Sequence, residues 1–312
     1  MAGEFKRVTP IGKRPRCLFG HRVPPLPANP RRHLAMANCS TAGRVMHQID
    51  LSEVRPAPRV RSIRYYGGKS PMGRGTGKWI AALLPNDADT VYCEPFAGML
   101  GVLLQRAPAR HEIVNDLNGD IVNFWRVLRD QPEELAHKIL CTPQSRELFF
   151  EAHSLLQQSP PSIDRAWAVY TVLNWSYQSR LTDRSFALST KCALTAWKLP
   201  QFKRLYERVK NIAIENCDGA ELISRLGDDE KVVFYIDPPY PSAVKSREYC
   251  GIGANFDKLL PALQRLRCRA AISGYPGEWD FLGWRRRELE VVNRAARTKK
   301  KERVVECLWT NW

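Results

Sequence analysis

The 312-residue sequence lacks the paired cysteines that a zinc site or a disulfide framework would use. Its nine cysteines are scattered, with no Cys-x-x-Cys pair and no histidine cluster beside them. We therefore expect no metal site and reduced thiols, as in the cytoplasm. The sequence also has no apolar run near the roughly 18 residues that a membrane-spanning helix requires. These absences exclude a metal-held or disulfide-held scaffold and give no sign of membrane insertion.

Negative charge is scarce as well, since 32 Asp and Glu face 48 Lys and Arg, a net charge of +16. Such an excess favours a polyanionic partner, with nucleic acid first and an anionic membrane surface second. A protein that is merely basic is the plain alternative. Residues 1–60 hold +8 of this charge, with eleven Lys and Arg, three Asp and Glu, and eight prolines. No helical or strand period is present there, so we expect a disordered arm that either tethers DNA or is simply solvated.

From residue 61 onward, segments with strand character alternate with segments of helical period. Strands are expected within 89–98, 111–118, 211–217, 231–237, 269–276 and 304–312, and helices at 78–85, from 102 onward and at 119–140. This alternation predicts βαβ units and an α/β, doubly wound, mainly parallel sheet formed by 61–130 and 211–312. Residues 131–210 show no clear strand and are rich in Trp, Tyr, Leu and Arg, which predicts a mostly helical insertion.

The segment "VVFYIDPPY" at 232–240 combines a buried strand with an unusual end. Five consecutive apolar residues predict a strand that is covered on both faces. Pro238 and Pro239 cannot donate hydrogen bonds to a neighbouring strand, and their fixed φ stiffens the turn that follows. Ligands of open α/β sheets bind outside the carboxyl ends of the strands. Asp237 and Tyr240 at this edge therefore indicate a functional site.

Two earlier strands also end in polar or glycine-containing segments, "EPFAG" at 94–98 and "NDLN" at 115–118. A glycine between a strand and a helix lets a ligand approach the backbone closely. Asp116 follows the next strand, where a carboxylate can accept both hydroxyls of a ribose. A lone aspartate at a strand end is also a common cap or turn residue. Taken together, the two strand ends point to a cofactor that contains a nucleoside.

At this point the sequence resembles the Dam-like N6-adenine DNA methyltransferases of the class-alpha amino-methyltransferase family. The resemblance runs from about residue 61 to the end and keeps the family's motif order. The matching segments are "RYYGGKS" (64–70), "EPFAGMLGVLL" (94–104), "NDLN" with "IVNFW" (115–125), "ENCDGAELI" (215–223), "DPPY" (237–240) and "RVVECLWTNW" (303–312). One position departs from the pattern, because Leu100 stands where the family loop has its second glycine, with Gly101 beside it.

The resemblance implies the Rossmann-like fold of methyltransferases that use S-adenosylmethionine (AdoMet), with a helical insertion. It also implies that a set of residues binds this cofactor: Tyr65, Gly67, Gly68, Lys69, Glu94, Phe96, Gly98, Asp116 and Asp218. Within that set, Asp116 would hold the ribose hydroxyls and Asp218 the adenine amino group. The alternatives are a solvated surface lysine for Lys69 and a helix cap for Asp218.

The implied chemistry agrees with what the "DPPY" turn offers. The exocyclic amine of adenine is a poor nucleophile because its lone pair is conjugated into the ring. Asp237 and a backbone carbonyl held by Pro238 and Pro239 would accept its two N–H groups, which is catalysis by orientation and electrostatics. Tyr240 would stack on a base that has been turned out of the duplex. The sequence has no Pro-Cys dipeptide, which argues against methylation at carbon 5 of cytosine.

The insertion 131–210 occupies the family's target-recognition position. Asn174, Arg180 and Arg184 lie there among aromatic residues and would contact phosphates and base edges. An ordinary helical subdomain with core aromatics is the alternative. Lys299, Lys300 and Lys301 belong to a basic run that would contact phosphates, unless it is only solvated.

We thus expect a monomeric, cytoplasmic enzyme that acts on double-stranded DNA without a metal. Whether a restriction endonuclease accompanies it stays open at this stage. One rival keeps the fold but changes the acceptor to the amino group of cytosine or to adenine in RNA. Another rival is a DNA-binding protein that has lost catalysis, and Leu100 in the glycine loop is its one hint.

Overall fold

The structure is a computed structural model, and it describes residues 50–52, 54, 55, 60, 62–69, 75–188, 199–240, 255–292 and 303–312. All of these lie in one compact unit, His47–Trp312. No helix in this described part of the chain combines the length and the apolar character needed to cross a membrane.

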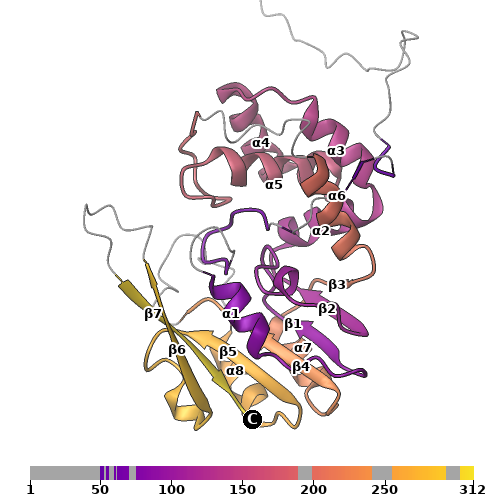
Figure 1. The fold of residues 1–312 in the computed structure, drawn as a ribbon. Helices are drawn as coiled ribbons and strands as arrows, with labels where there is room; N and C mark the ends of the chain where they lie inside the picture. Colours follow the sequence, from indigo (N-terminus) through magenta and orange to yellow (C-terminus); the bar gives the residue numbers. More distant parts are fainter. Residues whose placement is uncertain are drawn as a thin grey trace, which may run out of the picture. The chain divides into compact units, whose positions relative to one another are not determined.

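The centre of the unit is a seven-stranded sheet in the order β3-β2-β1-β4-β5-β7-β6 (Figure 1). Its strands are β1 Val91–Glu94, β2 His111–Asn115, β3 Ala213–Glu215, β4 Val232–Ile236, β5 Arg269–Gly274, β6 Arg285–Val292 and β7 Arg303–Thr310. β7 runs antiparallel to β5 and β6, whereas the pairs among β1 to β5 are parallel. The strand order changes direction between β1 and β4, which is where open α/β sheets bind ligands.

Helices cover both faces of this sheet, so its central strands have no solvated face. Val233 and Tyr235 of β4 pack into one core with residues of α1 (Thr76–Leu83) and the 3₁₀ turn η1 (Leu103–Gln105). Val232, Phe234 and Ile236 alternate with them and pack against α7 (Gly219–Leu226) and α8 (Phe256–Gln264). This alternation explains the unbroken apolar run of β4. It confirms the predicted α/β, doubly wound, mainly parallel sheet.

Within the described residues, the insertion 131–210 contains the helices α3 Pro132–Leu140, α4 Arg146–Gln158, α5 Ile163–Trp175 and α6 Leu199–Val209, and α2 Gly119–Asp130 directly precedes it. The side chains of Asn118, Ser145 and Ser162 cap the N-termini of α2, α4 and α5, which satisfies backbone N–H groups that have no partner within the helix. The helix predicted at 119–140 is in fact two helices. Pro132 is the reason, because it lacks an N–H and suits only the first turn of α3.

Two sequence expectations differ from the structure. The helix predicted from residue 102 onward is wrong, because only the short turn η1 forms before the chain becomes extended at Arg106. Pro108 accounts for this, since the residue before a proline disfavours helical geometry. β6 was not predicted, because its sequence "RRRELEVV" opens with three arginines and resembles a surface loop. It is held by its pairing with β7.

Part of the segment that we predicted as an arm is packed. Leu51 is 2% exposed and belongs to the core cluster beside the helices, and Lys203 of α6 donates to the carbonyl oxygen of Ser52 at 3.1 Å. The rest of the predicted arm, apart from residues 50, 54, 55 and 60, lies outside the described residues.

Candidate active site

Asp237 lies directly after β4, at the carboxyl edge of the sheet and next to the change in strand direction. Its nearest charged partner is Lys69, whose Nζ lies 2.7 and 2.8 Å from the two carboxylate oxygens. The lysine is 7% exposed, so the alternative of a solvated surface lysine is wrong. The sequence did not predict this contact, because the two residues are 168 positions apart.

The protonation of this pair follows from burial and from a second carboxylate. Burial lowers the pKa of Lys69, but the charges of Asp237 and Glu306 more than offset this effect and raise it above its ordinary value. Burial raises the pKa of Asp237, and the ammonium of Lys69 offsets only part of that rise. The lysine therefore stays charged between two carboxylates.

Glu306 is a site residue that sequence reasoning missed. It is 4% exposed on β7, and its Oε1 lies 3.3 Å from Nζ of Lys69. The same oxygen accepts the hydroxyl of Tyr240 at 2.6 Å. A signal was available, because a lone acid inside the apolar strand "VVECLW" must find a partner when it is buried.

The ring of Tyr240 is held from three sides. Besides the bond to Glu306, it packs edge to face with Tyr275 at 4.9 Å between ring centres. Lys69 Nζ lies 4.9 Å from the centre of the Tyr240 ring. Pro238 is buried and Pro239 half-buried, so the turn that carries the tyrosine is itself enclosed. Asp237 and Tyr240, on either side of the two prolines, thus both contact Lys69.

The segment that carries Lys69 packs closely on the loop after β1. Gly68 donates its N–H to the carbonyl of Tyr65 at 3.1 Å, and Gly67 has a φ of 75°. A Cβ on Gly98 would touch the Tyr65 ring at 3.4 Å, and a Cβ on Gly101 would lie 2.9 Å from the backbone nitrogen of Lys69. Gly101 therefore permits the close approach of the lysine segment, as does Gly77, whose Cβ would lie 2.4 Å from the carbonyl oxygen of Lys69.

Leu100, the departure from the family pattern, adopts the left-handed conformation with a φ of 56°. Its side chain is fully buried in the core, so the leucine turns inward. The loop is fixed by the indole N–H of Trp125, which donates to the carbonyl of Gly98 at 2.9 Å. The left-handed backbone costs a non-glycine residue about 1–2 kcal/mol, which burial of the leucine offsets.

Asp116 bridges the first two strand ends. Its two oxygens accept the backbone N–H groups of Gly98 and Asn118, each at 2.8 Å. Burial nevertheless raises its pKa. Its neighbour Asn115, which sequence reasoning passed over inside the "NDLN" motif, donates to the carbonyls of Pro95 at 2.9 Å and Cys217 at 3.0 Å. Asn115 thus ties the carboxyl ends of β1, β2 and β3 together.

Asp218 and Phe96 meet at the start of α7. Asp218 is the N-cap of this helix and accepts the N–H of Ala220 at 2.9 Å, as its structural alternative predicted. A Cβ on Gly219 would lie 2.6 Å from Cζ of Phe96, so the glycine makes room for the ring. A cofactor role for Asp218 would use its other oxygen, which lies 3.8 Å from Lys258 Nζ.

Glu94 closes β1 and is 2% exposed. Tyr92 donates its hydroxyl to Oε1 of Glu94 at 2.7 Å. Burial raises the pKa of Glu94 to about 7, although that hydrogen bond acts in the opposite direction. The carboxyl edge of the sheet therefore holds a third acid with a raised pKa, besides Asp237 and Asp116, and such groups gather at functional sites.

The residues predicted to contact DNA have different surroundings. Asn174 donates to the carbonyl of Tyr170 within α5 at 2.8 Å. The guanidinium of Arg180 stacks on the ring of Tyr66, and Arg184 is exposed. The turn between Ser176 and Phe186 that carries both arginines is closed by a β-bridge. The remaining predicted contacts, Lys299, Lys300 and Lys301, lie outside the described residues.

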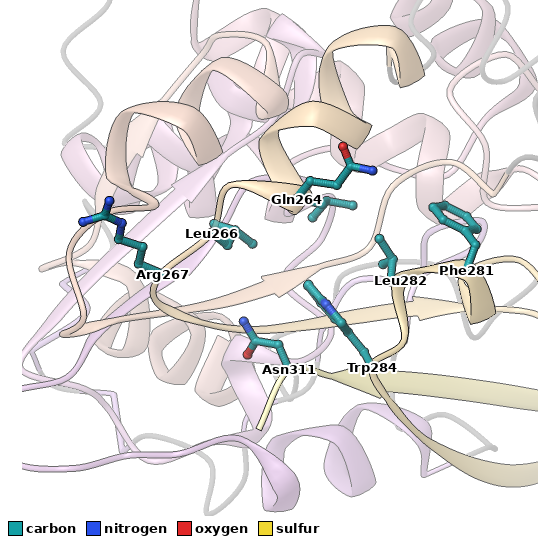
Figure 2. Close-up of a pocket in the computed structure, with 8 residues that line it drawn as sticks. Gln264, Leu266, Arg267, Phe281, Leu282, Trp284 and Asn311 are labelled. Carbon is teal, nitrogen blue, oxygen red and sulfur yellow. The ribbon is translucent and has the colours of Figure 1, made fainter.

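A pocket with a volume of about 480 Å³ lies elsewhere (Figure 2). Its lining includes Arg267 before β5, Trp284 before β6 and Asn311 after β7. These positions belong to the amino edge of the parallel strands, opposite the edge that carries Asp237. None of the residues that line it belongs to the predicted site.

Comparison with known proteins agrees with the motifs. A family model described as "D12 class N6 adenine-specific DNA methyltransferase" matches residues 65–261. A type II methyltransferase of Lactococcus lactis subsp. cremoris is 28% identical over 170 residues. That match covers 48% of this chain and 56% of the relative, so the chain spans about half the length of that relative.

Similar solved structures are distant. A candidate RNA methyltransferase of Pyrococcus horikoshii is 13% identical, with 83% of this chain and 93% of that chain covered and a TM-score of 0.33. A precorrin 8W decarboxylase of Methanobacterium thermoautotrophicum is 14% identical, with 75% and 87% covered and a TM-score of 0.29. Scores this low support no argument, so the fold rests on the strand order itself. The family match, by contrast, spans well over half of the sequence, and the chain belongs to the D12 class of N6 adenine-specific DNA methyltransferases.

Proposed function

We propose that this protein transfers a methyl group from AdoMet to the exocyclic N6 amine of an adenine in double-stranded DNA. The observation that carries the proposal is Asp237, a largely buried carboxylate on a stiff proline turn after a central strand, beside Tyr240. The family match supports the choice of adenine and DNA. We further propose a monomer in the cytoplasm, with or without a partner restriction endonuclease.

The residues at the first three strand ends suit the AdoMet nucleoside. A carboxylate has about four lone-pair sites, and Asp116 uses two of them on backbone N–H groups. The other two remain for ribose hydroxyls, and Asp218 would accept the adenine amino group beside Phe96. Tyr65, Gly67, Gly68, Lys69, Glu94 and Gly98 would complete the binding site. AdoMet supplies the electrophilic methyl group of its sulfonium.

Asp237 would accept one N–H of the target amine and a backbone carbonyl of the proline turn the other. These two hydrogen bonds would draw the nitrogen lone pair out of conjugation and direct it toward the methyl donor. As the bond from nitrogen to the methyl carbon forms, the bond from that carbon to the sulfonium sulfur would break, and its electron pair would stay on sulfur to give S-adenosylhomocysteine. The methylated nitrogen would then release one proton to solvent. Because the prolines fix the turn before the amine arrives, little reorganisation is needed at the moment of reaction. The face of Tyr240 would hold the extruded base by stacking.

Recognition of DNA would come from the insertion and from the positive charge of the chain. Asn174, Arg180 and Arg184 would act at the target sequence, and Lys299, Lys300 and Lys301 would contact phosphates. Contacts with phosphates carry no base information, so they would set affinity and its salt dependence.

The test is methylation of DNA by the purified protein with methyl-labelled AdoMet, followed by separation of the nucleosides. We expect N6-methyladenine in DNA, and none from Asp237→Ala. Label in N4-methylcytosine or only in RNA would overturn the choice of acceptor. AdoMet binding without any transfer would identify a DNA-binding protein that has lost catalysis. Expression in a methylation-free host, with sequencing of modified adenines, then gives the recognition sequence.

A further inference from the structure

Two carboxylates, the buried one of Glu306 and the half-buried one of Asp237, share one buried ammonium at the proposed active site. Lys69 Nζ lies 2.7 and 2.8 Å from the oxygens of Asp237 and 3.3 Å from Oε1 of Glu306. The exposed fractions of the Lys69 and Glu306 side chains are 7% and 6%. Glu306 lies on β7, beyond the segment 65–261 that matches the family model.

This arrangement conflicts with the role proposed for Asp237. The target amine must donate an N–H to Asp237, but Lys69 already donates to both of its oxygens. Each oxygen keeps a second lone pair, but the ammonium offsets the negative charge of both, so the amine meets a stronger acceptor once the ammonium leaves one oxygen. A buried ammonium that loses a partner without gaining another is strongly disfavoured.

Glu306 offers the replacement. Its Oε1 is already within ion-pair distance of Lys69, so a small movement of the lysine side chain is enough. The hydroxyl of Tyr240 bonds to the same oxygen, which keeps the carboxylate facing the lysine.

The net charge of the site also points to Glu306. With the lysine protonated and both acids ionised, the three groups carry a net charge of −1. Positive charge develops on the amine as its new bond to carbon forms, and a net negative surrounding stabilises it. With Asp237 and Lys69 alone, the two charges would cancel.

We propose that Glu306 is a positioning residue that takes over Lys69 when the target amine binds, and so frees Asp237 to act. The inference rests on the proposed function. A purely structural ion pair is the competing account. Glu306 would then stabilise β7 against the rest of the site without affecting the chemical step.

The decisive variant is Glu306→Gln, which keeps an oxygen for Tyr240 but removes the charge. We expect the single-turnover methylation rate to fall roughly a hundredfold, as when one preorganised polar group is lost. The dissociation constant for AdoMet, measured by calorimetry, and the midpoint of urea unfolding should change little. Glu290→Gln is the matched control, because Glu290 is an exposed acid on β6, paired with Arg303, and should behave as the parent.

The pH dependence of the rate separates the two accounts. Asp237 is the stronger acceptor for an N–H when it is ionised, and it faces Lys69, Glu306 and Tyr240. Because the charge of Glu306 raises the pKa of Asp237, Glu306→Gln should move the acid side of the pH–rate profile to lower pH. Glu306→Asp retains the charge and should lose less than about tenfold in rate, with the acid side unmoved. It also serves as the test variant if Glu306→Gln does not fold.

The outcomes distinguish the inference from the proposed function. An active parent with an equally active Glu306→Gln overturns the inference alone. The inference is also overturned if Glu306→Gln and Glu306→Asp lose the same amount of rate and the pH–rate profile does not move. That outcome is expected if Glu306 has only a structural role. A parent that transfers no methyl group overturns the proposed function, and the inference with it.

Discussion

The guanidinium of Arg180 lies 3.3 Å from the centre of the Tyr66 ring. Tyr66 also donates its backbone N–H to the carbonyl of Ser179 at 3.0 Å. The turn predicted to recognise DNA therefore packs on the segment predicted to bind AdoMet. We therefore expect a change in either segment to alter the position of the other through these contacts.

Arg180→Met, which removes the charge but keeps an extended side chain, tests this connection. A cation–π contact contributes about 0.5–2 kcal/mol, so we expect AdoMet binding to weaken about twofold to thirtyfold. Calorimetric titration with AdoMet in the absence of DNA measures this directly. Arg184→Met is the control, since Arg184 is exposed and should affect DNA binding only. Unchanged AdoMet binding in Arg180→Met would leave Arg180 a role with DNA alone.

Asp116 and Asp237 should separate cofactor binding from catalysis. Asp116 would hold the ribose in the ground state and the transition state alike, so Asp116→Ala should chiefly weaken AdoMet binding. The loss of a charged hydrogen bond, about 1.5–3 kcal/mol, corresponds to roughly a tenfold to hundredfold rise in Kd. Asp237→Ala should bind AdoMet nearly as the parent does but lose almost all turnover, because its contact forms mainly in the transition state.

Calorimetry and single-turnover methylation on both variants decide this pair. Because Asp116 also accepts the N–H groups of Gly98 and Asn118, the midpoint of urea unfolding of Asp116→Ala controls for damage to the loop. Near-normal turnover in Asp237→Ala, or parent-like AdoMet binding in Asp116→Ala, contradicts the assignment.

Glu94 should make the folded state less stable as the pH rises. Its pKa is about 7 in the folded protein and ordinarily 4.5. Below about pH 4.5 the acid is protonated in both states, and between these values only the folded state keeps the proton. Stability therefore falls across this window and is level above it.

The size of that loss follows from the difference in pKa, which corresponds to roughly 3 kcal/mol. Urea unfolding gives the free energy of unfolding of the parent and of Glu94→Gln at pH 5 and at pH 8. The loss is the change, between these two pH values, in the difference between the parent and the variant. A difference that is the same at both pH values would show that Glu94 is ionised throughout.

Gly101→Ala should disturb the active site without touching a catalytic residue. Its Cβ would lie 2.9 Å from the backbone nitrogen of Lys69, so the lysine segment has to shift away from Asp237. A shift of this kind costs orientation, and we expect a tenfold to hundredfold fall in kcat, on the order of the effect of a misplaced group. Gly119→Ala is the control, because a Cβ there would meet its nearest neighbour at an ordinary 3.8 Å. Equal activity of the two variants would show that the lysine segment adjusts freely.

The sequence predicted those features that depend on neighbouring residues. The five apolar residues of β4 and the two prolines after it predict a buried strand with a stiff end. This prediction uses only residues that are neighbours in the sequence. Contacts across the sheet were not predictable in this way. The contact of Lys69 with Asp237 and the place of Glu306 in the site were missed, because both depend on how distant segments pack together. η1 replaced the expected helix because Pro108 restricts the chain just where the apolar pattern continues.

The separation of the charged residues along the chain bears on how the domain folds. Lys69 and Asp237 are 168 residues apart, and Tyr240 and Glu306 are 66 apart. Contacts between such distant residues form late, because closing long loops costs entropy before any contact rewards it. β4 must pair with β1, and β7 with β5, before Lys69 can contact the carboxylates of Asp237 and Glu306. During refolding, methyl-transfer activity should therefore return after most of the helical signal, and it reports the completed sheet.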